Sequence, residues 1–457
     1  MVIVFALAVL AVLAVLALVA ALHWYVWRRL VRDATRGPGL ARRVGTGVFV
    51  AGPTLMITAL VAERSGAPFW LQRTLAWPGF LWMALSLYLL LAVVAGEVVR
   101  PLLRRLVERR APVQSPAAEE PEPETASVVA VAAESAAPGD VDGPSATAPR
   151  PAGPAPKGSA AEAPEAAGAF EAVEAPEAAE VPDLTRRLFV SRVVAGAAAT
   201  TAVATVGYGT YGVLRGPGVK RVTVPLARLP RSAHGFRIAV VSDIHLGPVL
   251  GRGFAQKVVD TVNATQPDLI AVVGDLVDGS VKDLGPAAAP LARLSARHGA
   301  YFVTGNHEYF SGAEQWVEEV RRLGLHPLEN ARTELPAFDL AGVNDIAGES
   351  EGRGPDFGKA LGDRDPSRAV VLLAHQPVQI HEAVKHHVDL QLSGHTHGGQ
   401  LWPGNLIAAA ANPTVAGLDR YGDTQLYVSR GAGAWGPPTR VGAPSDITVI
   451  ELASRGA

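Results

Sequence analysis

The chain has 457 residues, a formal net charge of −2 and no cysteine. The lack of cysteine excludes disulfides, thiolate zinc sites and cysteine nucleophiles, so any bound metal must be held by His, Asp, Glu or Asn. The near-neutral charge provides no global basic field, which argues against nucleic-acid binding as the main task.

The N-terminal region, residues 1–110, is expected to form three transmembrane helices. Residues 2–22 are an uncharged apolar run of spanning length, followed by an aromatic cluster and arginines as at a membrane interface. Further apolar runs cover residues 44–62 and 76–98. The first run lacks a basic leader and is therefore unlike a cleavable secretory signal, so we expect it to be retained.

Arginines flank these runs unevenly. Six arginines follow the first run and five follow the third, whereas the loop between the second and third has only Arg64 and Arg73. Positively charged loops favour the cytoplasmic side, so the N-terminus is predicted outside and the end of the third span inside.

Residues 111–182 are rich in Ala, Pro and Glu and contain too few large apolar side chains to form a core, so we expect a disordered acidic linker that acts as a spacer. In residues 183–216, Arg186 and Arg187 precede a mildly apolar run over 193–214. This pattern resembles a twin-arginine export signal, which would make the export machinery a partner, or it is an ordinary fourth span. Both interpretations put the rest of the chain outside the cytoplasm.

The remaining segment, residues 217–457, alternates short β-rich runs with helical ones, which predicts an α/β domain. Five of the β-rich runs end in side chains that can bind a metal. Ligand sites in α/β sheets lie at the carboxyl ends of strands, so we expect these side chains to meet at one site. They are Asp243, His245, Asp275, Asn306, His375, His395 and His397.

This set combines neutral imidazole with hard oxygen donors, which suits Mn, Fe or Zn better than calcium. Seven ligands are too many for one ion, so two divalent ions that share a carboxylate are the simplest arrangement. Such a pair lowers the pKa of a bridging water towards about 7 and clamps the oxygens in a phosphoryl displacement. The expected substrate is a phosphate ester or anhydride.

The order D-x-H, G-D, G-N-H-E, a lone His and G-H-x-H resembles the calcineurin-like metallophosphoesterase superfamily over about residues 235–452. The run GHTHGGQ and the C-terminal segment look like its membrane-associated bacterial branch of phosphodiesterases and lipid-sugar nucleotide pyrophosphatases. The resemblance implies a four-layer sandwich of two facing mixed β-sheets flanked by helices, preceded here by transmembrane helices. It also implies a ligand set for each ion: Asp243, His245 and His397 for the first, Asn306, His375 and His395 for the second, and Asp275 as the bridge.

The resemblance further implies that His307 is the acid that protonates the leaving oxygen, held in its tautomer by a carboxylate such as Glu308 or Asp278. Outside the shared motifs, Arg430 and Arg440 are candidates for contact with a phosphate, because the guanidinium fork matches its oxygens. Pairing of these arginines with solvent or a carboxylate is the equal alternative.

The sequence therefore predicts a multi-pass membrane protein with an extracytoplasmic, binuclear metal-dependent phosphoesterase domain. It would hydrolyse a phosphodiester or pyrophosphate bond of a small-molecule or lipid-linked substrate through a metal-bridging hydroxide. One alternative is a non-catalytic metal-binding scaffold or sensor, and another is a cytoplasm-facing lipid-nucleotide pyrophosphatase. The presence of His307 favours an enzyme, since a scaffold needs no acid. Trp402 and Trp435 either line an apolar substrate cleft or pack the loops, and packing is the favoured expectation.

Overall fold

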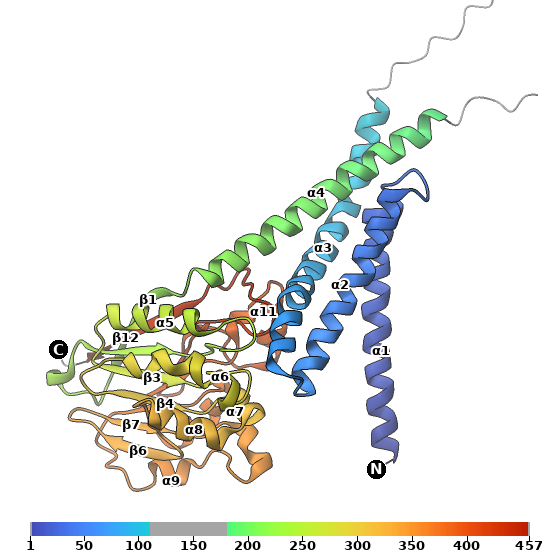
Figure 1. Ribbon diagram of the computed structural model, residues 1–457. Helices are drawn as coiled ribbons and strands as arrows, with labels where there is room; N and C mark the ends of the chain where they lie inside the picture. The colour runs from blue at the N-terminus through green and yellow to red at the C-terminus, as the bar shows by residue number, and fades with distance from the viewer. Residues whose placement is uncertain (1, 110–180, 456–457) are drawn as a thin grey trace, which may run out of the picture.

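The computed structural model describes residues 2–109 and 181–455. Its N-terminal part consists of long helices, and in the described residues four of them are long and apolar enough to cross a membrane. Figure 1 shows them extending from one end of a two-sheet domain. They are α1 (Val2–Trp27), α2 (Leu40–Arg64), α3 (Phe69–Arg109) and α4 (Val181–Leu214).

These helices overlap the four apolar runs of the sequence, but α3 is longer than its run. It continues through an arginine-rich segment to Arg109, where hydropathy alone predicts an end near residue 98. A short π-helix, η1 (Arg28–Arg32), follows α1, and its Arg29 lies 3.0 Å from Glu97 of α3 in an ion pair. The predicted linker over 111–182 lies almost entirely outside the described residues.

The C-terminal part contains two six-stranded mixed sheets. The first has the order β1-β12-β2-β3-β4-β5, and the second has the order β10-β11-β9-β8-β7-β6. Strands β2 to β5 run parallel to one another, as do β7, β8, β9 and β11. The strands of the first sheet are β1 (Gly218–Leu226), β2 (Phe236–Val241), β3 (Leu269–Val273), β4 (Ala300–Val303), β5 (His326–Pro327) and β12 (Asp446–Ser454). Those of the second are β6 (Ala331–Glu334), β7 (Asp339–Gly342), β8 (Val370–Leu373), β9 (Leu390–Ser393), β10 (Gly417–Tyr421) and β11 (Thr424–Val428).

The two sheets pack face to face, and helices cover their outer faces. Along β2, Ile238 and Val240 face the second sheet, whereas Ala239 and Val241 face the helices, as the period of two in a strand requires. The predicted four-layer α/β sandwich is therefore confirmed. The helices of this part are α5 (Arg252–Ala264), α6 (Val281–Ala288), α7 (Asn306–Ser311), α8 (Ala313–Arg322), α9 (Phe357–Leu361), α10 (Ile380–Lys385) and α11 (Gly404–Ala411). The short 3₁₀ turns are η2 (Arg231–Ala233), η3 (Ala289–Arg293), η4 (Ile346–Glu351), η5 (Pro377–Gln379) and η6 (His397–Gly399).

The two-sheet domain is docked against the long helices by polar and apolar contacts. The hydroxyl of Tyr88 on α3 donates to the carbonyl oxygen of Trp402 at 3.0 Å. The hydroxyls of Thr210 on α4 and Thr439 lie 2.7 Å apart. In Figure 1, α11 lies beside α3 at this junction. The loops that follow β9 therefore lie against the helix bundle.

Candidate metal centre

The predicted ligands meet at the carboxyl ends of five strands. Strands β2, β3 and β4 supply them from the first sheet, and β8 and β9 from the second. Five of them have a left-handed backbone, with φ between 48° and 74°. This conformation costs a residue other than glycine about 1–3 kcal/mol, and such residues cluster at functional sites. The five are Asp243, His245, Asp275, His395 and His397.

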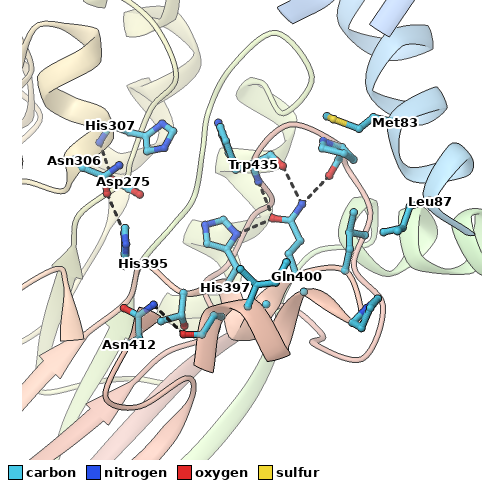
Figure 2. Close-up of a pocket in the computed structure, with 18 of the residues that line it drawn as sticks. Met83, Leu87, Asp275, Asn306, His307, His395, His397, Gln400, Asn412 and Trp435 are labelled. Atoms are coloured by element: carbon cyan, nitrogen blue, oxygen red, sulfur yellow. Dashed lines mark hydrogen bonds between the residues drawn. The ribbon is translucent and has the colours of Figure 1, made fainter. Parts of the chain in front are cut away.

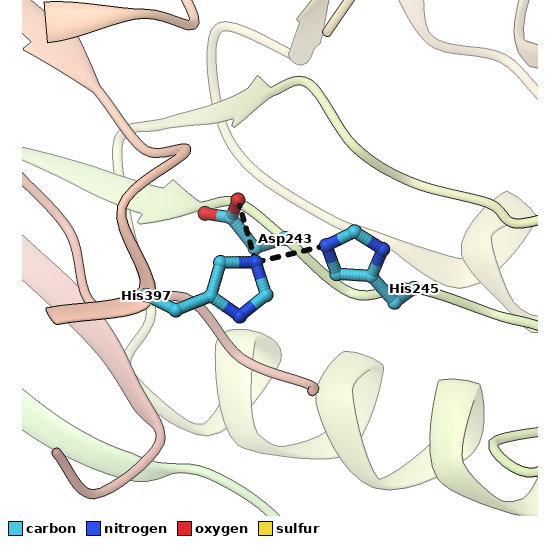
Figure 3. A group of neighbouring side chains, drawn as sticks. All are labelled: Asp243, His245 and His397. Atoms are coloured by element: carbon cyan, nitrogen blue, oxygen red, sulfur yellow. Dashed lines mark hydrogen bonds and ion pairs between the residues drawn. The ribbon is translucent and has the colours of Figure 1, made fainter. Parts of the chain in front are cut away.

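The first group consists of Asp243, His245 and His397, shown in Figure 3. Nε2 of His245 lies 2.9 Å from Nε2 of His397, which in turn lies 3.3 Å from Oδ1 of Asp243. Each imidazole donates its Nδ1–H elsewhere: His245 to Oδ1 of Asp278 at 2.9 Å, and His397 to Oε1 of Gln400 at 2.8 Å. Both Nε2 atoms therefore carry lone pairs that face one point, as ligands of a cation do.

The second group consists of Asp275, His375 and His395. Nδ1–H of His375 donates to the carbonyl oxygen of Val273 at 2.9 Å, which leaves a lone pair on Nε2. That buried Nε2 lies 3.1 Å from Oδ2 of Asp275 but has no hydrogen-bond partner among the described residues. Nδ1 of His395 lies 3.0 Å from Oδ1 of Asn306. Buried polar atoms are nearly always satisfied, so this group also fits a cation.

Asp275 lies between the two groups. Its Oδ2 is 3.1 Å from Nε2 of His375 and 3.8 Å from Nε2 of His245 in the first group. The carboxylate is buried, and although burial alone raises a carboxyl pKa, interactions with the adjacent imidazoles of His375 and His245 outweigh it and hold the pKa of Asp275 well below its usual range. The structure thus brings together all seven predicted ligands, with Asp275 in the position of a bridge.

His307 lies beside this site, in the first turn of α7. Its Nδ1–H donates to Oδ1 of Asp278 at 2.7 Å, and the same oxygen accepts from His245. Burial by itself lowers the pKa of His307, but the hydrogen bond and the charge of Asp278 outweigh it and raise the pKa to about 9. Of the two predicted carboxylate partners, the structure puts Asp278 against His307. A raised pKa favours the protonated imidazole that general-acid catalysis requires.

Glu308 points away from His307 and organises the backbone of the site. Its buried carboxylate accepts from the backbone N–H groups of Asp275, Leu276 and Gly305 at 2.7–3.0 Å. It thereby ties the turn after β3 to the turn after β4. These contacts make Glu308 a positioning residue, whereas the sequence offered it as a direct partner of His307.

Arg430 and Arg440 lie behind the ligands. The buried guanidinium of Arg440 donates to the carbonyl oxygens of Gly433, His397 and Ala443 at 2.6–3.1 Å. Arg430 lies 4.0 Å from Asp446. Neither arginine is among the described residues that line the cavity over the metal site. Contact with a phosphate and pairing with solvent or a carboxylate were equal expectations for both arginines, and the contacts of Arg430 with Asp446 and of Arg440 with backbone carbonyl groups favour a structural role.

A cavity of about 680 Å³, here called the metal pocket, opens over the ligands. Figure 2 shows Asp275, His307 and His395 on one side of it and His397 with Gln400 on the other. The metal pocket is also lined by Trp435, whose ring centre lies 5.5 Å from that of His307. Trp435 was predicted to pack the loops, but its side chain is half-exposed beside the site.

The long helices complete the wall of the metal pocket. Arg64 at the end of α2 and Met83 and Leu87 of α3 line it, and Figure 2 shows the two α3 side chains facing the Gln400 loop. Sequence reasoning missed these residues, because the apolar runs carry no signal of which face meets the domain. Gln400 could have been predicted as a site residue, since it ends the run GHTHGGQ that contains His395 and His397.

Residues 236–399 match the family model of calcineurin-like phosphoesterases. A zebrafish (Danio rerio) "transmembrane protein with metallophosphoesterase domain" is 38% identical over 259 residues, which cover 54% of this chain and 59% of the relative. An uncharacterized metallophosphoesterase of Helicobacter pylori (strain J99) is 38% identical over 55% of this chain and 68% of the relative. One of Aquifex aeolicus is 35% identical over 52% of this chain and 92% of the relative.

The chain thus spans about three fifths of the zebrafish relative but nearly all of the Aquifex one. The shared region contains the strand ends that carry the ligands, in the order and fold described above. The chain belongs to the calcineurin-like phosphoesterase family.

Proposed function

We propose that the protein is a membrane-anchored phosphoesterase that uses two divalent metal ions to hydrolyse a phosphodiester or pyrophosphate bond. One observation carries the proposal: two groups of imidazole and carboxylate side chains flank a common carboxylate, Asp275, with the imidazole of His307, hydrogen-bonded to Asp278, beside them. A scaffold that only binds metal would not need His307.

The first ion would be held by Asp243, His245 and His397. The second would be held by Asn306, His375 and His395, with Asp275 shared. Nitrogen and oxygen donors without sulfur fit Mn, Fe or Zn. When bound, the ions would lower the pKa of a water and neutralise charge on the phosphoryl oxygens.

The remaining steps fall to side chains of the protein. His307, held by Asp278, would donate its proton to the leaving oxygen as the bond from that oxygen to phosphorus breaks. Asp278 would keep the imidazole protonated and fix its orientation. Glu308 would keep the turns after β3 and β4 in register, so that Asp275 and Asn306 face one site.

The arrangement of the helices supports an extracytoplasmic domain. The arginine-rich end of α3 and the start of α4 lie at the opposite end of the helices from the two-sheet domain (Figure 1). At this same end, Arg29 pairs with Glu97, and Arg192 donates to the carbonyl oxygen of Ala34. If the positive ends face the cytoplasm, the domain faces outward.

The direct test is hydrolysis of bis-p-nitrophenyl phosphate by the full chain in detergent, with bound metals counted by mass spectrometry. We expect about two transition-metal ions per chain and turnover that a chelator abolishes. Asp275→Asn is the matched control for metal-independent hydrolysis. Metal binding without turnover on monoester, diester and pyrophosphate substrates would favour the scaffold and overturn the proposal.

A further inference from the structure

We propose that the metal pocket receives a lipid-linked phosphoester whose hydrocarbon chain lies in a groove between α1, α2 and α3. This inference rests on the proposed function and names its substrate class. The groove, here called the helix groove, is a cavity of about 350 Å³. Among its described lining residues only His23 and Ser86 are polar, so its contents must be almost entirely apolar.

The helix groove and the metal pocket adjoin each other. Met83 and Leu87 of α3 line both cavities, so the same two side chains touch the apolar contents of one and the opening of the other. Figure 2 shows them facing the loop that carries His397 and Gln400. A molecule with a phosphate at the metal ligands and a chain leading away past Leu87 would occupy both.

The position of the junction along α3 can be compared with the thickness of a bilayer. The ion pair of Arg29 with Glu97 marks the charged end of the helices. Met83 and Leu87 precede Glu97 by 14 and 10 residues, so at about 1.5 Å per residue they lie roughly 21 and 15 Å along α3 from it. If this charged end lies at one surface of the hydrocarbon core, which is about 30 Å thick, both side chains fall within the core. The metal pocket would then open towards lipid on this side.

The rim of the metal pocket suits contact with lipid. Leu406 and Ile407 on α11 are 66% and 76% exposed, and none of the described residues of α11 is buried. Phe310 and Trp435 are further exposed apolar side chains beside the site. An exposed apolar surface of this kind around a polar centre is costly in water but favourable in an interfacial layer.

A cation also lies at the opening. Arg64 lines the metal pocket at the end of α2, and its guanidinium carbon lies 5.9 Å from the centre of the Phe310 ring. A guanidinium at the level of the lipid headgroups pairs well with a phosphate oxygen. An amphiphilic substrate would thus put its hydrocarbon chain in the helix groove and its reacting phosphate at the buried ligands. Its headgroup would lie near Arg64.

The test uses a chain-length series of p-nitrophenyl alkyl phosphates, from methyl to octyl, with the full protein in lipid nanodiscs. Water adds to phosphorus, the bond to the aryl oxygen breaks, and p-nitrophenolate and the alkyl phosphate are released. We expect kcat/KM for the octyl ester to exceed that for the methyl ester at least about tenfold, because the methylenes leave water for an apolar site.

Leu90 lines the helix groove but not the metal pocket, so Leu90→Trp fills the groove alone, and Val94→Trp puts the same aromatic side chain at an exposed position on α3 as the matched control. Leu90→Trp should lower the octyl-to-methyl ratio at least about fivefold, and Val94→Trp should leave it within about twofold. In both variants, a content of bound metal equal to that of the parent would show that the two-sheet domain is intact. Ser86→Phe also fills the groove and provides the same test if Leu90→Trp does not fold.

The outcomes separate the two proposals. If the parent hydrolyses none of the esters, the proposed function fails. If it hydrolyses the methyl and octyl esters equally, or if Leu90→Trp and Val94→Trp change the ratio alike, the helix groove does not hold the substrate chain, and the phosphoesterase assignment stands. A groove occupied by another protein helix predicts this second result.

Discussion

Nδ1 of His307 lies 2.7 Å from Oδ1 of Asp278, and the same carboxylate oxygen accepts from Nδ1 of His245. One carboxylate thus fixes both a ligand of the first proposed ion and the proposed acid. Burial by itself raises the carboxyl pKa of Asp278, but the hydrogen bonds from both imidazoles and the charge of His307 outweigh it and hold the pKa well below its usual range. The negative charge that results keeps His307 protonated.

Replacing the acid should separate catalysis from metal binding. His307→Ala removes the proton donor and leaves the seven ligands in place, so we expect kcat for bis-p-nitrophenyl phosphate to fall about a hundredfold or more, or roughly 2.7 kcal/mol of transition-state stabilisation. Metal content should change little. Steady-state kinetics with metal analysis check both, and kcat close to that of the parent would refute the assignment.

Removing the shared carboxylate should abolish metal binding as well as activity. Asp275→Ala deletes the group that lies 3.1 Å from Nε2 of His375 and 3.8 Å from Nε2 of His245, so we expect most bound metal to be lost together with activity. Mass spectrometry of the purified protein gives the stoichiometry. Full metal occupancy in this variant would show that Asp275 does not bridge.

The sequence predicted the ligands because each directly follows a buried strand, where position along the chain fixes position in the sheet. It could not decide between Asp278 and Glu308 as partner of His307, since Glu308 adjoins His307 in the chain and Asp278 closely follows Asp275, which is expected at the same site. Glu308 lies in the first turn of α7, where its side chain folds back onto backbone N–H groups. Arg64, Met83 and Leu87 were not predictable as pocket residues, since their place depends on how separate segments dock.

Glu308→Gln should weaken the fold around the site. The variant keeps the shape of the side chain but replaces one carboxylate oxygen with an NH₂ group, which faces the backbone N–H donors that Glu308 now satisfies. Leaving a buried donor unpaired costs about 1–3 kcal/mol, so we expect a clearly lower melting temperature. Calorimetry of the metal-loaded protein measures it. A melting temperature equal to that of the parent would mean that these contacts contribute little.

Arg430 and Arg440 offer a matched pair of variants. Arg440→Met removes the donor of the buried carbonyl oxygens of Gly433 and Ala443 and one of two donors to that of His397, so it should destabilise the protein by about 1–3 kcal/mol and weaken metal binding. Arg430 is partly exposed and 4.0 Å from its nearest carboxylate, so Arg430→Met should change stability by about 0.5 kcal/mol or less. Chemical denaturation and metal titration compare them. Equal effects would contradict the structural role given to Arg440.

The side of the membrane can be tested with single cysteines, because the chain has none of its own. Arg297→Cys puts a thiol on an exposed site of the two-sheet domain, and Arg36→Cys puts one in the exposed loop between α1 and α2, at the arginine-rich end. If the domain is extracytoplasmic, a membrane-impermeant maleimide should label Arg297→Cys in intact cells and Arg36→Cys only after permeabilisation. The reverse pattern would place the domain in the cytoplasm. It would leave the metal chemistry unchanged but restrict a lipid substrate to the inner leaflet.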